Sequence, residues 1–77
     1  MESFGQRVRR LRQFGVMTQT DLATKAGISL VTVARLENDA EINPRPTTVR
    51  RLAAALGVEP SWLLFGEAVD HPLKSAA

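Results

Sequence analysis

The sequence predicts an all-α domain built from five short helices. Apolar residues recur at the three- and four-residue spacing of helices in five successive segments. No segment alternates apolar and polar residues for long enough to indicate a β-strand. We expect helices over residues 3–14, 19–26, 30–38, 48–56 and 60–65 of a domain spanning 1–66, followed by a flexible tail over 67–77.

The first predicted helix has one apolar stripe and several basic faces. The stripe consists of Phe4, Val8, Leu11 and Phe14, and Gly15 ends the helix. The other faces carry Arg7, Arg9, Arg10 and Arg12. A second basic group contains Arg45, Arg50 and Arg51. Such clusters attract polyanions, but they are also typical of solvated helix faces, so charge alone leaves both interpretations open.

The second and third helices are separated by a very short turn. Thr18 and Asp21 have the spacing of a capping box at the start of the second helix. Gly27 ends that helix in a left-handed conformation, and Ser29 already caps the next one. So short a connection forces the two helices to cross steeply, which predicts a helix-turn-helix unit.

The third helix has two apolar sides, although a buried helix needs only one. Val33 and Leu36 fall on the predicted inner side. The opposite side carries Val31, Ala34, Arg35 and Asn38, with Leu30 on one flank and Thr32 on the other. A side without Lys or Glu is not typical of a helix that faces water. We therefore predict a contact surface, covered either by the major groove of DNA or by protein.

The last two helices follow a loop, "DAEINPRP", that contains two prolines. The fourth helix is predicted to begin at Thr47 or Thr48 and to end at Gly57. The fifth has Pro60 at its first position and contains the apolar run "WLLF". Trp62 is expected in the core, and the remaining apolar surface of this helix is the candidate interface for a second subunit.

Composition excludes several classes of function. The 77 residues include no Cys and one His, so no disulfide, metal site or cofactor is expected. No apolar run is long enough to span a bilayer, and we expect a cytoplasmic protein without membrane contact. No nucleophile, base and orienting group form a recognisable set, so an enzyme is not expected.

The runs "MTQTDLATKAGISLVTVARLEND" and "LAAALGVEPSWLLFG" resemble the Cro/C1-type (XRE-like) helix-turn-helix domains of phage repressors and bacterial regulators. The resemblance covers roughly residues 4–66 and implies a compact, lambda-repressor-like five-helix fold. It also implies that the third helix reads bases from the major groove of double-stranded DNA.

The resemblance assigns roles to individual residues. It implies base contacts by Leu30, Val31 and Arg35, with Thr32 close by, and the outward set adds Ala34. Gln19 matches a residue that binds a phosphate, beside the cap residue Thr18, and Asn38, Arg12 and Arg45 are further candidates for phosphate contacts. Arg12 and Glu37 match a structural ion pair. The chain departs from the pattern at Asp39, where the family usually has Gly, and at the apolar Leu30 and Val31.

Two functional hypotheses follow. The first is a sequence-specific transcriptional regulator, expected to be a repressor, that binds a palindromic operator as a homodimer with half-sites ~34 Å apart. The second is a protein-interaction module, such as an antitoxin or a regulator subunit, whose Leu30 and Val31 contact a protein.

Overall fold

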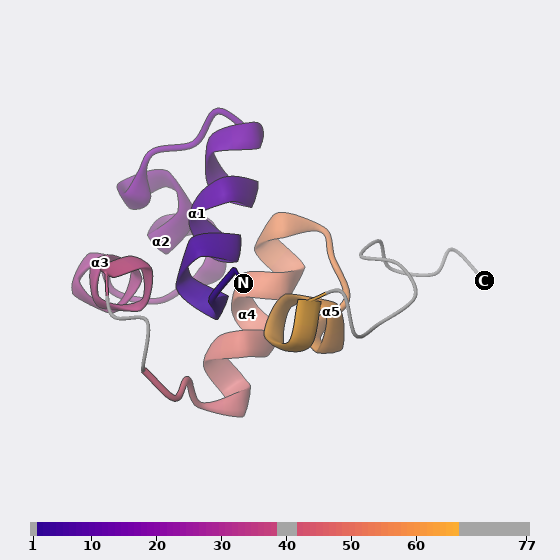
Figure 1. Cartoon of the computed structure of the whole chain (residues 1–77). Coiled ribbons are helices and arrows are strands. Elements are labelled where there is room, and N and C mark those ends of the chain that lie inside the picture. Colours follow the sequence, from indigo (N-terminus) through magenta and orange to yellow (C-terminus); the bar gives the residue numbers. More distant parts are fainter. Residues whose placement is uncertain (1, 39–41, 67–77) are drawn as a thin grey trace.

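The computed structural model describes residues 2–38 and 42–66, and five helices make up the regular structure of this part. They are α1 (Phe4–Phe14), α2 (Gln19–Ala26), α3 (Leu30–Asn38), α4 (Pro46–Leu56) and α5 (Pro60–Phe65). Helix α1 packs against α3, α4 and α5, and α2 packs against α3 and α4 (Figure 1). The all-α prediction is confirmed. Helices α3 and α5 lie on opposite sides of α1 (Figure 1).

Two reciprocal capping boxes start the first two helices. The predicted box holds α2: the Thr18 hydroxyl accepts a hydrogen bond from the Asp21 amide at 3.0 Å, and the Asp21 carboxylate accepts one from the Thr18 amide at 2.9 Å. The Thr18 amide, and then its hydroxyl, lower the pKa of Asp21. An equivalent box between Ser3 and Gln6, which sequence analysis missed, starts α1 at Phe4.

The other helix ends differ from the prediction at one point. Ser29 caps α3 by accepting from the Thr32 amide at 3.1 Å, and Gly27 and Gly57 adopt the left-handed conformation predicted for helix ends. The predicted start of α4 at Thr47 or Thr48 is wrong, because α4 begins at Pro46. Proline suits the first position of a helix, since its fixed φ is helical and no amide is needed there.

The core lies where α1, α2, α3, α4 and α5 meet. The largest fully buried side chains are Val8, Leu22, Val33, Leu36, Leu52 and Leu63. Trp62 is buried as predicted. Phe14, the last residue of the predicted α1 stripe, is 88% exposed. The C-terminal end of α1 projects past α4 (Figure 1), so the apolar stripe leaves the core before it reaches Phe14.

Two predictions concern residues outside the described part of the chain, and two concern membrane helices and metal sites. The predicted tail over 67–77 and the turn at Asp39 lie outside the described residues. Within residues 2–38 and 42–66, no helix is long and apolar enough to cross a membrane. The same part of the chain contains no group of three or more acidic, His or Cys residues placed to hold a metal ion.

Gly5 sets how closely α1 approaches α3. A Cβ atom at this position would overlap the carbonyl oxygen of Leu36 and lie 3.2 Å from the Cα atom of Glu37. Both obstacles are backbone atoms, which cannot rotate away as a side chain can. The absence of a side chain at Gly5 therefore allows α3 to lie directly on α1.

We predict that Gly5→Ala lowers the free energy of unfolding by about 1–3 kcal/mol, because the added methyl group forces α1 and α3 apart. Urea denaturation followed by circular dichroism measures the loss. The control is Gln13→Ala at an exposed position of the same helix, where stability should be nearly unchanged. Equal stability of the two variants would show that the α1–α3 contact tolerates a side chain.

Candidate nucleic-acid interface

The outer side of α3 is an exposed surface of mixed chemistry. Val31 is 68% exposed and Leu30 is 46% exposed, while Val33 and Leu36 on the opposite side are buried. Arg35 and Asn38 are exposed, and Thr32 and Ala34 are half-buried. The angular prediction of inner and outer residues is confirmed for Val33 and Leu36. Helix α3 lies at an edge of the molecule (Figure 1). Its outer side therefore exposes apolar side chains and one guanidinium.

A polar depression of about 420 Å³ connects α3 with the segment that leads into α4. Its lining includes Thr32 and Arg35 from α3, Asn43 and Arg45 from the following segment, and Thr48 from the first turn of α4. Two guanidinium-bearing residues, Arg35 and Arg45, are therefore brought to one surface. Asn43 was not a candidate from sequence, because only the fold places it beside α3.

The position of α3 is fixed by a buried ion pair. The Glu37 side chain is fully buried, and its two carboxylate oxygens accept from Arg12 Nε at 2.8 Å and Arg12 Nη2 at 3.0 Å. The remaining terminal nitrogen of Arg12, Nη1, donates to the Met17 carbonyl oxygen at 2.7 Å. The hydrogen bond to Glu37 raises the pKa of Arg12. This pair ties the end of α3 to α1 and to the turn before α2.

Two further side chains converge on the same carboxylate. Gln19 Nε2 donates to Glu37 Oε1 at 3.1 Å, and Arg9 Nε lies 3.5 Å from that oxygen. The Arg9 side chain is 51% exposed, so its cationic end reaches the surface beside the first turn of α2. Two arginines around one carboxylate leave the cluster with a net positive charge. Sequence analysis did not single out Arg9, although it precedes Arg12 by one helical turn.

The N-terminal arginine cluster does not form one basic surface. Arg7 is buried and donates through Nε to the Leu63 carbonyl at 2.8 Å and through Nη2 to the Leu64 carbonyl at 3.0 Å. Arg10 instead donates to the Glu2 carboxylate at 2.7 Å. Counting Arg7 with a polyanion-attracting patch is wrong, because its guanidinium is used to hold the end of α5.

Comparison with known proteins identifies the family. The sequence model described as helix-turn-helix matches residues 8–63. The chain belongs to the Cro/C1-type helix-turn-helix family. It is 38% identical over 65 residues to the HTH-type transcriptional repressor RghR of Bacillus subtilis (strain 168). This match covers 84% of this chain and 48% of RghR. The chain thus spans about half the length of that relative.

Two solved structures have a similar helix-turn-helix fold. The restriction-modification controller protein C.AhdI from Aeromonas hydrophila is 34% identical with a TM-score of 0.72, and the match covers 79% of this chain and 91% of C.AhdI. The P22 c2 repressor, in complex with a synthetic operator, is 28% identical with a TM-score of 0.79. That match covers 87% of this chain and 100% of the repressor chain.

We predict that Glu37→Gln destabilises this helix-turn-helix domain by about 3–5 kcal/mol, because it leaves the buried Arg12 guanidinium without a counter-charge. A double-mutant cycle with Arg12→Met, measured by urea denaturation, isolates the coupling between the two side chains. The Arg12→Met/Glu37→Gln protein should lose less stability than the sum of the two single losses. Additive losses would show that the pair contributes no coupling energy.

Proposed function

We propose that this chain is a non-enzymatic, sequence-specific regulator of transcription that works in the cytoplasm as a repressor. In this proposal α3 inserts into the major groove of double-stranded DNA. The observation that carries it is the exposed outer side of α3, where Val31 and Arg35 lie over buried Val33 and Leu36. Membership of the helix-turn-helix family and the similarity to RghR and the P22 c2 repressor, both named as repressors, support the same conclusion.

The chemistry of the α3 surface suggests how bases are read. The exposed apolar groups of Leu30 and Val31 suit contacts with thymine methyl groups, and Ala34 leaves room for close approach. Arg35 has the paired donors needed for the two acceptors of guanine. Thr32 is a weaker candidate, since its hydroxyl already lies 2.8 Å from that of Ser29. Specificity should then depend on methyl contacts together with one arginine.

Phosphate contacts would flank this surface at both ends of the helix-turn-helix. Gln19 lies in the first turn of α2, where Thr18 caps the helix and the free amides favour an anion. Asn38 at the end of α3 and Arg45 beside Arg35 extend the contacts along the DNA. Arg12 already donates to Glu37 and Met17, so we assign the phosphate contact near α1 to the more exposed Arg9.

A homodimer on a palindromic operator completes the proposal. One short recognition helix reads only a few base pairs, and two copies spaced by about one helical turn of DNA supply the missing specificity. The candidate interface is α5, where Phe65 is 63% exposed and Leu64 is half-buried next to a small apolar depression of about 280 Å³. Trp62 and Leu63 of the same helix are buried and therefore belong to the core.

A protein-interaction module is the second candidate, because Leu30 and Val31 are exposed apolar residues on α3. Salt dependence separates the two functions. Neutralising DNA phosphates releases counterions, so the logarithm of the binding constant falls with the logarithm of salt concentration by about 0.9 per phosphate contact. A mobility-shift titration against random duplex DNA at several salt concentrations measures this slope, and a protein-binding module would give no salt-sensitive retention.

We predict that Arg35→Ala loses about 1–3 kcal/mol of binding at one G·C pair and relaxes the base preference there. Gln19→Ala should weaken binding to all sequences alike, because a phosphate contact carries no direct base information. Selection from a randomised duplex library first gives the preferred site. Titration of each variant against single-base changes in that site then measures both effects.

The matched control for Arg35 is Lys25→Ala, which removes one positive charge from the last turn of α2, where Lys25 lines a depression with Ala55 and Leu56 of α4 and not the depression beside α3. It should leave the base preference intact. If Arg35→Ala kept both the affinity and the base preference of the original chain, α3 would not be reading DNA through Arg35.

We also predict that Phe65→Ser weakens binding to the full palindrome by at least about tenfold, or about 1.4 kcal/mol, and leaves half-site binding unchanged. The exposed side chain should be lost from the subunit interface without a loss of core packing. Analytical ultracentrifugation of the protein–DNA complex gives the stoichiometry. Phe14→Ser, which alters a still more exposed aromatic residue on α1, is the control, and equal effects of both variants would argue against α5 as the interface.

A further inference from the structure

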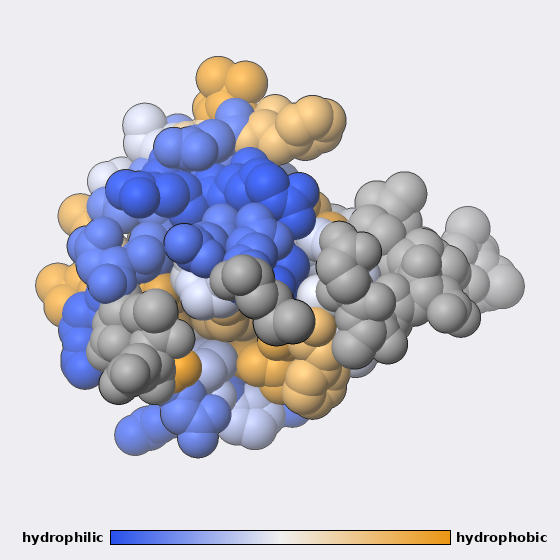
Figure 2. Space-filling view, viewed as in Figure 1, coloured by the Kyte–Doolittle hydropathy of each residue, from blue (hydrophilic) through white to orange (hydrophobic). Residues whose placement is uncertain are grey.

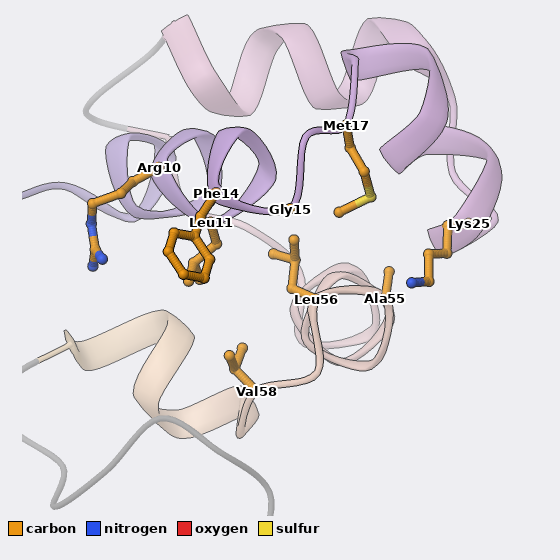
Figure 3. A pocket seen from close by; sticks show the side chains of 9 residues that line it. All are labelled: Arg10, Leu11, Phe14, Gly15, Met17, Lys25, Ala55, Leu56 and Val58. Atoms are coloured by element: carbon orange, nitrogen blue, oxygen red, sulfur yellow. The ribbon is translucent and has the colours of Figure 1, made fainter.

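An apolar groove lies between the end of α1 with the turn that follows it, the end of α2, and the junction of α4 with α5. We call it the α1–α4 groove, and its volume is about 590 Å³. Figure 3 shows its apolar lining side chains gathered from these elements. They are Leu11, Phe14, Met17, Ala55, Leu56 and Val58. None of the residues proposed to contact DNA lines it.

The turn beside this groove exposes more apolar surface than the fold requires. Phe14 is 88% exposed and the neighbouring Val16 is 90% exposed. Figure 2 shows hydrophobic residues over the turn between α1 and α2. Val16 also has a φ of 56°, a left-handed conformation that costs a β-branched residue about 1–3 kcal/mol. Large apolar groups displayed in this way mark a surface that binds something.

Charge determines which kind of partner fits. Arg10 and Lys25 lie at opposite ends of the groove (Figure 3), and none of its described lining residues is acidic. The Glu2 carboxylate accepts from Arg10 at 2.7 Å and 3.1 Å and balances its charge. The exposed positive charge beside the groove is therefore that of Lys25 at the end of α2. An occupant that carries acidic residues beside its apolar ones is therefore favoured.

A second copy of this chain does not have that complementarity. In a symmetric pair the same surface is used on both subunits, and its lining offers no acidic residue to pair with Lys25 of the other subunit. We propose that the α1–α4 groove binds an amphipathic helix of another protein, with apolar residues spaced one helical turn apart and Asp or Glu residues flanking them.

The shape of the groove is consistent with a helical occupant. Its walls are helices, and helix-in-groove binding uses apolar anchors that repeat at three- and four-residue intervals. Binding of an extended peptide by strand addition would instead need the free edge of a β-sheet, and the regular structure of the described residues is helical. Because the groove and the proposed DNA surface share no residue, the partner helix can bind while α3 contacts DNA.

Two designed peptides test this proposal on the full chain. Each has about four helical turns and the same leucine stripe, and the flanking residues are Glu in one peptide and Lys in the other. In an NMR titration of the isotope-labelled protein, the Glu peptide should shift the amide signals of Phe14, Val16 and Leu56. It should also bind at least about tenfold more tightly than the Lys peptide.

Three variants make the result specific to the groove. Lys25→Glu should reverse the preference between the two peptides, and Arg50→Glu, on α4 but outside the groove, should leave it unchanged. Phe14→Ser should weaken Glu-peptide binding without unfolding the protein, because the side chain is 88% exposed.

Equal binding of both peptides, no binding, or signal shifts at other residues would overturn the proposal. Concentration-dependent shifts at Phe14 without peptide would overturn it in favour of self-association. DNA binding is measured separately, so its failure would leave this result intact.

Discussion

The buried carboxylate of Glu37 is the interaction on which the arrangement of the helix-turn-helix depends. Its oxygens accept hydrogen bonds from Arg12 of α1 and Gln19 of α2, so one side chain at the end of α3 joins the first three helices. A fully buried carboxylate is costly unless it is paired in this way. The cost disappears only in one arrangement of the three helices, and the outer side of α3 is thereby held in one orientation.

Close packing and electrostatics act on the same contact. Gly5 allows the α1 backbone to lie against Leu36 and Glu37, and this approach brings the carboxylate within reach of Arg12. Val33 and Leu36 fill the inner side of α3, so no room remains for the helix to rotate its outer residues inward. The apolar residues on the outer side are consequently exposed, and this exposure gives α3 the chemistry of a reading surface.

Much of the fold could be predicted because its signals are local. Thr18, Ser29 and Gly27 act on backbone groups a few residues away, and their roles follow from type and spacing. The hydrogen-bond partners of each arginine could not be predicted, because they depend on residues distant in sequence. Arg7, for example, donates to two carbonyl groups of α5. Phe14 matches the helical period, but periodicity carries no information about where neighbouring helices end.

The outer side of α3 and the α1–α4 groove both expose apolar side chains, and their charges distinguish them. On α3 the apolar residues lie beside Arg35, and Arg45 reaches the same depression, so the surface suits a polyanion with methyl groups in its groove. In the α1–α4 groove, the charges stand only at the two ends of a continuous apolar lining. A polyanion such as DNA gains little binding free energy from such a lining. An amphipathic helix with acidic residues matches both the apolar centre of the groove and its Lys25 end. The domain thus has room for a protein partner on a face that DNA binding leaves open.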